Sequence, residues 1–371
     1  MMQFSPQQSA AIDAVSAWHK ANEKQVFRVF GYAGTGKTTL ARHFAEGLKG
    51  RVLYAAYTGK AAMMMRKNGC LNASTIHSTI YAVDVNKTTG ATKFILKHKG
   101  EFEGVALLVI DECSMVDQDI GQEILSFGIP VLVLGDPAQL PPVSPGAGFF
   151  TECDPDVMLT EIHRQAAESP IIQMATIVRE GGRLQYGAYG ASEVIKRSYL
   201  VPDHVMKADQ VLVGTNKTRS GYNQRMREIL GRKQTLPEKG DRLVCLKNDH
   251  GMGLFNGGLW NVLYVGKRRA GHIEDHCVAM DVTSLDFEMT TPVKVKARKE
   301  CFDGRLKEVN WQELRGTQQF DYGYALTVHK AQGSQWDNVC LFDEGGAFAD
   351  SRARWLYTGL TRAAEKITVV M

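Results

Sequence analysis

Short apolar runs alternate with amphipathic stretches along the N-terminal part of the chain. The runs are bounded by polar or glycine residues, a pattern typical of buried strands, and apolar residues at helical spacing fill several intervals between them. Strands that alternate with helices predict a mainly parallel sheet with helices on both faces, and such sheets bind ligands at the carboxyl ends of their strands. The predicted strands are Val26–Phe30, Val52–Ala56, Val105–Ile110 and Val131–Leu134, and the predicted helices include Thr39–Leu48 and Gly59–Met65.

A helix is also predicted close to the N-terminus. Ser5 can cap it, Pro6 suits its first position, and Gln8 stands where a capping box has its second partner. Beyond this cap, apolar residues recur at the spacing of one helix face, and they are Ile12, Val15 and Trp18.

Two later stretches depart from the alternation of strands and helices. Residues 81–100 have the pattern of two strands around the turn Thr89-Gly90, which predicts an inserted hairpin. Residues 259–319 hold short alternating stretches, which predict a small β-rich insert resembling a five-strand barrel. The pattern of a parallel sheet returns on either side of that insert, in the predicted strands Gln210–Gly214, Tyr324–Val328, Val339–Asp343 and Lys366–Val370.

Length and composition indicate a globular protein with more than one core. The chain has 371 residues, of which 44% are hydrophobic and 23% are charged, and its net charge is +4. This length predicts two lobes, whereas the mild basicity is compatible with a polyanionic partner without demonstrating one. Seven scattered cysteines favour a reducing compartment. Because we find neither a secretory leader nor an apolar run that could span a bilayer, we expect a cytoplasmic protein without a membrane partner.

The motif Gly31-Tyr-Ala-Gly-Thr-Gly-Lys-Thr38, called the P-loop below, follows the first predicted strand. Its glycines let the backbone bend and turn its N–H groups toward phosphate oxygens. A helix that begins near Lys37 would add the positive end of its dipole. Lys37 supplies a charge for the β- and γ-phosphates and Thr38 a hydroxyl for Mg²⁺, so the motif predicts a nucleoside triphosphate site.

Two acidic residues end the apolar strand Val105–Ile110. Asp111 at the tip of the strand can hold Mg²⁺ through water, and Glu112 can polarise the water that attacks the γ-phosphate. The alternative is a turn at the end of the strand with two solvated acids, and the presence of the P-loop weakens that interpretation. Gln139, in the loop after the next strand, is a candidate to sense the γ-phosphate, and the alternative is that this loop is an ordinary proline-rich turn.

Two arginines are candidates for charge stabilisation. Arg164 lies just beyond the first predicted lobe, and Arg362 lies near the C-terminus. A planar guanidinium neutralises the charge of a transferring phosphoryl group, and a charge that comes from another lobe would couple hydrolysis to closure of the cleft. A lone arginine is usually a surface ion-pair partner, so this prediction depends on the preceding motifs.

Polar segments in both halves of the chain offer groups for a nucleic-acid backbone. Residues 324–334 lead from a strand into a loop with hydroxyl, imidazole and ammonium groups. Residues 58–60 and 74–78 offer similar donors in the first half. Each of these groups alone is more often structural than functional, and His77 and His329 are equally well explained as core histidines.

Taken together, these segments resemble the superfamily 1B DNA helicases, the group that contains the RecD and Dda proteins. The resemblance spans nearly the whole chain, and the ordered set of motifs is far more specific than any one of them. In chain order, the matching segments are Phe4-Ser-Pro-Gln7-Gln8, the P-loop, Ala56-Tyr-Thr58-Gly-Lys60, Ser74-Thr-Ile-His77-Ser78, Ile110-Asp-Glu-Cys-Ser-Met115, Gly135-Asp-Pro-Ala-Gln-Leu-Pro-Pro142, Ile162-His-Arg-Gln165, Val328-His-Lys-Ala-Gln-Gly333-Ser334 and Tyr357-Thr-Gly-Leu-Thr-Arg362.

The resemblance implies an α/β fold with two RecA-like P-loop NTPase lobes, ATP and Mg²⁺ between them, and single-stranded DNA across both. The implied domains are lobe one at 1–80 and 101–163, a strand-separating hairpin at 81–100, lobe two at 164–258 and 320–371, and a barrel-like insert at 259–319. The implied catalytic residues are Lys37, Glu112, Gln139, Arg164 and Arg362, and the implied metal ligands are Thr38 and Asp111. The implied nucleotide contacts are Gln8, which would read adenine, Gly34, Thr35, Gly36, Lys37, Thr38, Thr39 and Gly333. The implied DNA contacts are Thr58, Lys60, His77, Phe94, Asn216, Thr327 and His329.

By the same resemblance, the predicted function is ATP-dependent unwinding of duplex DNA, with 5′ to 3′ movement on the strand that is gripped. Its implied partners are single-stranded DNA, duplex junctions and a single-strand-binding protein or a protein of replication or recombination. We expect a monomer in the cytoplasm of a bacterial cell, or of the host cell if the chain is encoded by a phage. Gln335-Trp336 departs from the family, where many relatives have an acidic residue and a phenylalanine. Two alternatives stay open, namely an RNA or RNA–DNA helicase and a nucleotide-gated protein that binds or loads single strands without unwinding.

Overall fold

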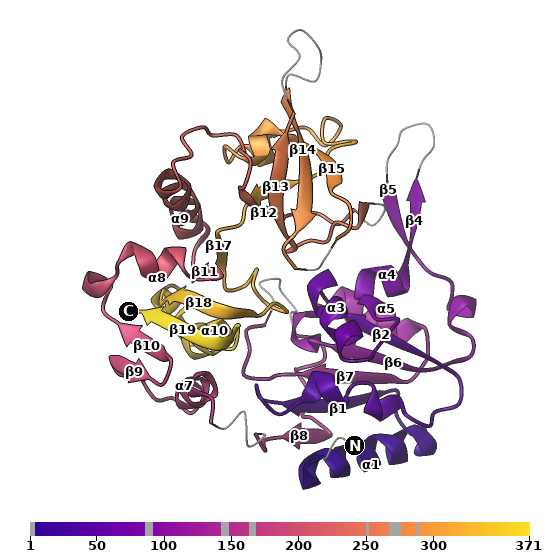
Figure 1. Cartoon of the computed structure of the whole chain (residues 1–371). Coiled ribbons are helices and arrows are strands. Elements are labelled where there is room, and N and C mark those ends of the chain that lie inside the picture. The colour runs from indigo at the N-terminus through magenta and orange to yellow at the C-terminus, as the bar shows by residue number, and fades with distance from the viewer. Residues whose placement is uncertain are drawn as a thin grey trace.

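The computed structural model describes residues 4–85, 92–141, 148–162, 168–249, 252–266, 276–286 and 289–371, with the backbone alone for residues 83–85 and 92–94. The described chain forms two parallel sheets side by side, with a small antiparallel sheet above them and a hairpin beside it (Figure 1). Among these residues, no helix combines the length and the apolar character that crossing a bilayer requires.

The first parallel sheet has the strand order β3-β2-β6-β7-β1-β8, and every neighbouring pair runs parallel. All four strands predicted for the N-terminal part of the chain are present in it. The strands are β1 (Val26–Gly31), β2 (Arg51–Ala56), β3 (Ser74–Thr75), β6 (Val105–Asp111), β7 (Val131–Gly135) and β8 (Val157–Leu159).

Helices cover both faces of this sheet because its central strands are apolar on both sides. Along β6, Leu107 and Val109 pack in the core that α1 and α3 cover, whereas Leu108 and Ile110 pack in the core that α4 and α5 cover. The sheet is therefore the middle of three layers (Figure 1). The helices are α1 (Pro6–Ala21), α2 (Lys37–Leu40), α3 (Gly59–Lys67), α4 (Ile76–Ile80) and α5 (Gln118–Ser126).

The local signals predict the start of these helices better than their length. The capping box of α1 forms as predicted between Ser5 and Gln8. The helix predicted over Thr39–Leu48 is wrong, because α2 ends at Leu40. His43 turns into the protein, where its ring centroid lies 4.8 Å from that of Phe4, so tertiary packing overrides the local helix preference. The 3₁₀ helices are η1 (His43–Ala45), η2 (Lys99–Phe102), η3 (Cys113–Met115), η4 (Arg197–Tyr199), η7 (Lys299–Cys301), η8 (Leu306–Glu308) and η9 (Gly345–Ser351).

The second parallel sheet has the order β17-β11-β18-β19-β10-β9, and only the edge strand β9 runs antiparallel to its neighbour. Helices again cover both faces, with α7 and α10 packed together on one of them. The strands are β9 (Gly187–Tyr189), β10 (Ser192–Ile195), β11 (Gln210–Val213), β17 (Ala325–Thr327), β18 (Trp336–Phe342) and β19 (Ala363–Val370). The helices are α7 (Pro170–Arg179), α8 (Pro202–Met206), α9 (Asn216–Ile229) and α10 (Arg352–Leu360).

The antiparallel sheet has the order β15-β14-β13-β12-β16. Its strands are β12 (Arg242–Cys245), β13 (Leu259–Val265), β14 (Cys277–Ser284), β15 (Val293–Arg298) and β16 (Phe320–Tyr322). Gln318, just before β16, bridges to Ala297 of β15, and its backbone N–H donates to the Lys296 carbonyl at 2.8 Å. This bridge joins the two edges of the sheet, which gives the barrel-like form that was predicted. The sheet extends beyond the predicted insert, because β12 and β16 lie outside residues 259–319.

The predicted hairpin is present as β4 (Tyr81–Val85) and β5 (Thr92–Leu96), which pair antiparallel. Its turn lies outside the described residues. The base of the hairpin is anchored to the first sheet, since the Tyr81 hydroxyl donates to Glu123 of α5 and the Lys97 ammonium donates to two carbonyls of α4 at 2.9 Å. The hairpin thus projects from the first sheet on the side where the barrel lies (Figure 1).

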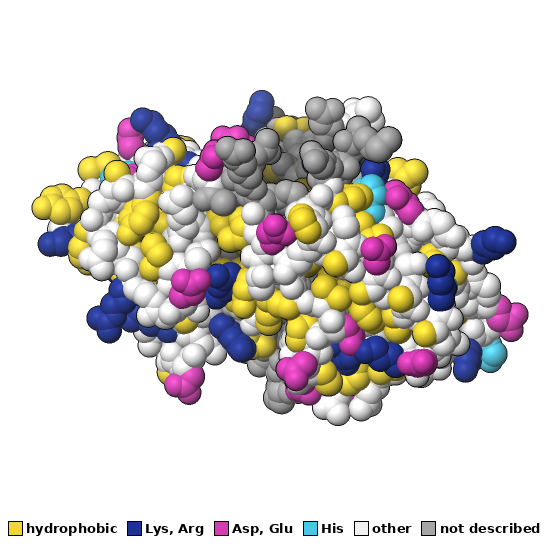
Figure 2. Space-filling view, turned by 90° about the horizontal axis from the view of Figure 1, so that it is seen from below, with side chains coloured by type: hydrophobic (Ala, Val, Ile, Leu, Met, Phe, Trp, Pro, Cys, Tyr) yellow, Lys and Arg dark blue, Asp and Glu magenta, His cyan; other side chains and the backbone are white. Residues whose placement is uncertain are grey.

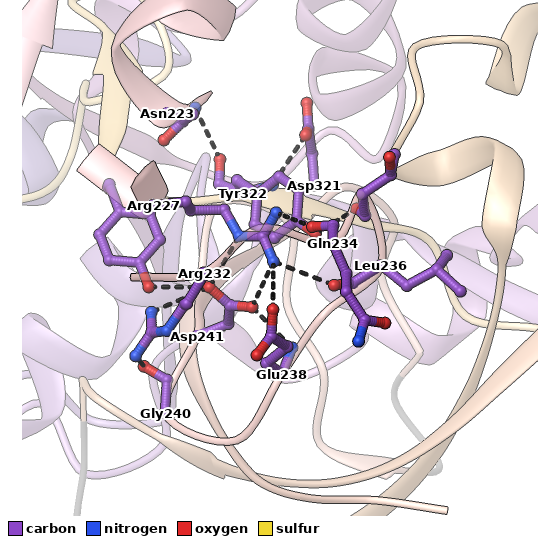
Figure 3. A network of polar contacts seen from close by, with 12 residues as sticks. Asn223, Arg227, Arg232, Gln234, Leu236, Glu238, Gly240, Asp241, Asp321 and Tyr322 are labelled. Atoms are coloured by element: carbon purple, nitrogen blue, oxygen red, sulfur yellow. Dashed lines mark hydrogen bonds and ion pairs between the residues drawn. The ribbon is translucent and has the colours of Figure 1, made fainter. Parts of the chain in front are cut away.

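A buried polar network joins the barrel to the second sheet (Figure 3). Asp241, just before β12, is fully buried, and its carboxylate accepts hydrogen bonds from Arg227 of α9 and from Arg232 at 2.9–3.1 Å. The Tyr324 hydroxyl donates to the same carboxylate at 2.9 Å. A buried carboxylate that is hydrogen-bonded to two guanidinium groups fixes the relative position of the elements that carry those groups. The barrel is therefore held firmly on α9.

The underside of the molecule mixes hydrophobic, basic and acidic side chains, and neither sign of charge forms a continuous field there (Figure 2). That face offers a polyanion no extended basic surface. The helices α3 and α4, which carry predicted DNA contacts, lie instead on the side that faces the barrel and the hairpin (Figure 1).

Candidate active site

A cavity of about 630 Å³ lies between the carboxyl ends of the first sheet and loops of the second. It is the place where a ligand of a parallel α/β sheet is expected. The first sheet and its helices contribute Gln8, Gly34, Gly36, Lys37, Thr38, Thr39, Asp111, Glu112, Asp136 and Gln139 to its wall. The second sheet contributes Gly333, Ser334, Gln335, Thr361 and Arg362.

The P-loop turns sharply after β1 because two of its glycines are left-handed, with φ of 83° at Gly34 and 79° at Gly36. Gly31 is needed for a different reason. A Cβ at Gly31 would lie 2.7 Å from Thr35 Oγ1 and 2.8 Å from the Cβ of Leu159. The loop therefore passes too close to β8 for any side chain. Thr35 is fully buried and donates its hydroxyl to a carbonyl of the loop at 2.8 Å, which fixes the turn from within.

The Lys37 ammonium lies over the P-loop and donates to the carbonyls of Gly31 and Tyr32, the second at 3.0 Å. The helix that begins at Lys37 has only four residues, so its dipole is weaker than the predicted longer helix would supply. The positive potential of the loop therefore comes mainly from the lysine and from the backbone N–H groups. Both suit an anionic group such as a phosphate.

Thr38 and Asp111 form the pair predicted to hold a metal. The Thr38 hydroxyl donates to Asp111 Oδ2 at 2.7 Å, and the Glu112 backbone N–H donates to Oδ1 at 2.9 Å. Burial raises the pKa of Asp111, although both hydrogen bonds and the charge of Lys37 oppose that rise. Hydroxyl and carboxylate oxygens are the hard donors that Mg²⁺ prefers, so the pair fits the ion when phosphate oxygens and water complete its shell. The described residues include no cluster of three His, Cys, Asp or Glu side chains that would hold a metal unaided.

Glu112 occupies an unusual backbone conformation at the end of β6, with φ of 54° and ψ of 43°. A left-handed conformation costs a residue with a side chain about 1–3 kcal/mol, and such strain gathers at functional positions. Burial raises the pKa of Glu112, and the charge of Arg362 opposes that rise, while Asp111 adds to it. A carboxyl group with a raised pKa is better suited to accept a proton near neutral pH.

Gln139 lies in the loop after β7, where its backbone N–H donates to the Asp136 carbonyl at 3.2 Å. The side chain is 8% exposed and lines the cavity. Its Oε1 has no hydrogen-bond partner among the described residues. Buried polar atoms without a partner are rare, and one at a cavity wall is an acceptor available to a ligand or a water molecule.

Arg362 reaches the same cavity from the second sheet, just beyond α10. It is 5% exposed, and its guanidinium donates to the carbonyls of Thr358 and Ser334 and to the Thr361 hydroxyl at 3.1–3.2 Å. Its charge acts on Glu112 across the cleft. The structure thus brings together a cation and a carboxylate that are far apart in the sequence.

Two predicted nucleotide contacts lie at the rim of the cavity. The buried Gln8 donates through Nε2 to the Thr35 carbonyl at 3.0 Å, which ties α1 to the P-loop. Gly333 has φ of 71°, and a Cβ there would lie 2.8 Å from Thr58 Oγ1. Arg164 lies outside the described residues, so its role stays a prediction.

The predicted DNA contacts of the first sheet lie where it meets the barrel. Thr58 caps α3 by accepting from the Ala61 N–H at 3.1 Å. The Lys60 ammonium forms an ion pair with Asp286 of the barrel at 2.8 Å and lies 4.4 Å from the ring centroid of Trp336. We call this contact the Lys60 clasp. His77 lies between two aromatic rings at the start of α4. The side chain of Phe94 lies outside the described residues.

The predicted DNA contacts of the second sheet differ in exposure. Asn216 is exposed at the first position of α9. Thr327 is buried at the end of β17, and its hydroxyl accepts from the Lys330 N–H at 3.3 Å. His329 is half-buried, and burial lowers its pKa, so its imidazole is a neutral donor rather than a cation near neutral pH.

Sequence reasoning missed several contacts between the two sheets, and three of them involve side chains at or near the cavity. Tyr357 of α10 is hydrogen-bonded to the P-loop and to Asp136. The Arg179 guanidinium of α7 lies 3.8 Å from the ring centroid of Tyr32, a cation–π contact. The third is the Lys60 clasp. Tyr357 and Lys60 stand inside recognisable motifs, but nothing in the sequence identifies their partners.

A P-loop that shares one cavity with an arginine from a second parallel sheet defines the class of two-lobed P-loop NTPases. A family model described as AAA domain matches residues 3–198, more than half of the chain, and a model described as UvrD-like helicase C-terminal domain matches residues 322–370. The chain belongs to this AAA domain family and, within it, to the superfamily 1B helicases.

Individual relatives agree with that assignment. The chain is 30% identical over 355 residues to the ATP-dependent RecD2 DNA helicase of Deinococcus radiodurans, covering 91% of this chain and 45% of that protein. It is 34% identical over 175 residues to the ATP-dependent DNA helicase Dda of Enterobacteria phage T4, covering 43% and 39%. The matched part of the chain therefore spans less than half the length of either relative. A crystal structure of Bacteroides Pif1 bound to single-stranded DNA shares the fold, with a TM-score of 0.59, 18% identity and coverage of 99% and 92%.

Proposed function

We propose that the chain hydrolyses ATP in the cleft between its two parallel sheets and uses the cycle to move 5′ to 3′ along single-stranded DNA and to unwind duplexes. The observation that carries this proposal is the meeting of Glu112 and Arg362 in one cavity beside the P-loop. Because hydrolysis would need residues from both sheets, each step of the ATP cycle would change the relative position of the two sheets. A motor requires such a change. The RecD2 and Dda relatives, both named as ATP-dependent DNA helicases, support the same activity.

The chemistry follows from the side chains at the cavity. The P-loop N–H groups and Lys37 bind the phosphates, and Gln8 stands at the rim for the adenine. Thr38 and Asp111 would hold Mg²⁺, which neutralises charge on the β- and γ-phosphates when bound. Glu112 accepts a proton from the attacking water, and Gln139 orients that water through its free Oε1. Arg362 stabilises the charge that develops on the transferring phosphoryl group.

The proposed path of DNA crosses the side of the sheets that faces the barrel. Its contacts on the first sheet would be Thr58, Lys60 and His77, and its contacts on the second would be Asn216, Thr327 and His329. The hairpin of β4 and β5 stands beside this path and is the proposed wedge, with Phe94 as its stacking side chain. Contacts of this kind make binding salt-dependent, and each stacked base contributes roughly 1–3 kcal/mol.

Duplexes with a single tail test the direction of movement. With ATP and Mg²⁺, we expect the protein to separate a duplex with a 5′ single-stranded tail and to leave one with a 3′ tail intact, because only the first lets it approach the junction in the proposed direction. The Lys37→Ala variant should separate neither. Tight, ATP-dependent binding without separation of either duplex would contradict the motor and favour a clamp. Stronger stimulation of ATPase by poly-U than by poly-dT would favour RNA as the strand that is gripped.

Shortening the hairpin tests its role as the wedge. Replacing residues 83–94 by a Gly-Ser turn keeps the Tyr81–Glu123 contact and the Lys97 anchors, so the first sheet should stay intact. We expect stimulation of ATPase by single-stranded DNA to be retained, since the cavity is untouched, and strand separation to be severely impaired. ATPase is measured with single-stranded DNA, and strand separation is measured on a duplex with a 5′ tail of the same sequence. Wild-type rates of separation would rule out the hairpin as the wedge.

A further inference from the structure

The hydroxyl of Tyr357 is shared between two segments of the first sheet, although Tyr357 belongs to α10 of the second. It accepts a hydrogen bond from the Ala33 N–H of the P-loop at 2.8 Å. It donates one to Asp136 Oδ2, in the loop that follows β7, at 2.7 Å. Tyr357 is 2% exposed and Asp136 is 1% exposed, so water replaces neither bond. One phenol therefore links the P-loop, α10 and the loop after β7 that carries Asp136 and Gln139, which we call the Gln139 loop.

Neighbouring contacts hold the same loop to the second sheet. The Leu140 N–H donates to the Thr358 hydroxyl at 2.9 Å, and the Leu140 carbonyl accepts from Gln332 Nε2 at 2.7 Å. These bonds hold the Gln139 loop to the second sheet but do not involve the P-loop. Among the described hydrogen bonds, the Tyr357 hydroxyl is the group that reaches both segments at once.

The same helical turn carries Arg362. The Thr361 N–H donates to the Tyr357 carbonyl at 3.0 Å, and Arg362 Nε donates to the Thr358 carbonyl at 3.1 Å. A displacement of Tyr357 therefore moves the guanidinium with it. Burial, first, and the nearby Asp136 raise the pKa of Tyr357, so the hydroxyl keeps its proton and can donate and accept together.

We propose that Tyr357 is a positioning residue that makes the placement of Arg362 depend on the conformation of the P-loop and of the Gln139 loop. The inference rests on the proposed function, since it names how the two halves of that catalytic site are kept in register. A P-loop that changes shape around a triphosphate shifts the Ala33 N–H, and the shift reaches α10 through the phenol. DNA bound across both sheets acts on the same link from the other side, so Tyr357 carries the coupling between DNA and hydrolysis.

Tyr357→Phe tests this link because it removes the hydroxyl and keeps the ring. Coupling between two sites typically changes the affinity of one site by 5- to 150-fold when the other is occupied. We expect an effect within that range on the rate, so the DNA-stimulated kcat divided by the basal kcat should fall about 10-fold. We expect KM for ATP to change by less than about 3-fold, because the phosphate-binding groups stay in place. Tyr189→Phe is the matched control. Its hydroxyl also accepts from a backbone N–H, at 2.9 Å, but it lies on the second sheet away from the cavity.

A cycle with Asp136→Asn separates the link from a loss of structure. If the hydroxyl acts through Asp136, the double variant should have the same stimulation ratio as Tyr357→Phe alone, whereas additive losses would overturn the relay. An unchanged ratio in Tyr357→Phe, or equal losses of basal and stimulated rates, would overturn the inference while leaving the proposed function intact. A wild-type protein whose ATPase DNA does not stimulate would overturn the proposed function and this inference with it.

Discussion

Arg362→Ala is expected to lower kcat for ATP hydrolysis about 10³-fold, the lower end of the effect of an arginine that stabilises phosphoryl transfer. Arg362 lines the cavity beside Glu112, and no other cation of the second sheet lines its wall among the described residues. KM should change little, since the P-loop and Lys37 bind the phosphates. The measurement is steady-state ATPase with saturating single-stranded DNA.

Arg354→Ala is the matched control, because Arg354 is exposed and lies on α10, the helix that ends just before Arg362. We expect it to hydrolyse ATP like the wild type. Arg362→Lys should recover only part of the rate, since an ammonium retains the charge without the planar fork. A variant lacking Arg362 that keeps more than a tenth of the wild-type kcat would exclude this residue from the transition state.

Glu112→Gln should bind ATP and hydrolyse it about 10²- to 10⁴-fold more slowly, the contribution typical of a general base. The amide fills the same space but cannot accept the proton of the attacking water. Glu103→Gln, at an exposed position two residues before β6, should have wild-type activity. Single-turnover hydrolysis measures the chemical step, and a near-normal rate would remove Glu112 as the base.

The pH dependence of the same variants gives a second readout. Because burial raises the pKa of Glu112, wild-type kcat should fall as pH decreases through that raised value, and Glu112→Gln should lack this acid limb. Arg362 opposes the rise, so removing it should move the limb to higher pH. An acid whose pKa is raised by folding makes the folded state less stable as pH increases between the ordinary and the raised pKa. Thermal unfolding near neutral pH should therefore find Glu112→Gln at least as stable as the wild type.

Features encoded by neighbouring residues could be predicted from the sequence. The capping box of α1 depends on Ser5 and Gln8, and the strand β6 on a run of apolar residues that ends in two acids. The resemblance to a family added what no local pattern holds, namely that Arg362 would share a cavity with Lys37. The positions of these residues in the fold thus follow from the sequence, whereas their roles stay predictions.

Features that depend on distant partners could not be predicted. The early end of α2 depends on where His43 packs, and the edges of the barrel depend on a bridge between Ala297 and Gln318. The Tyr357 hydroxyl finds partners more than two hundred residues away. Periodicity reports which face of an element is buried, but it does not report which polar atoms meet once that face is covered.

The Lys60 clasp bears on how the protein would respond to ionic strength. Lys60 is already neutralised by Asp286, both side chains being largely buried, and it also rests against the indole of Trp336. A DNA phosphate that contacts this lysine must first displace the Asp286 carboxylate, so an ion pair within the protein is exchanged for an ion pair with DNA. The release of condensed counterions from DNA is then offset by a newly exposed acid that gathers cations of its own. The number of phosphates inferred from a salt titration should therefore fall short of the number that touch the protein, with Lys60 among the contacts left uncounted.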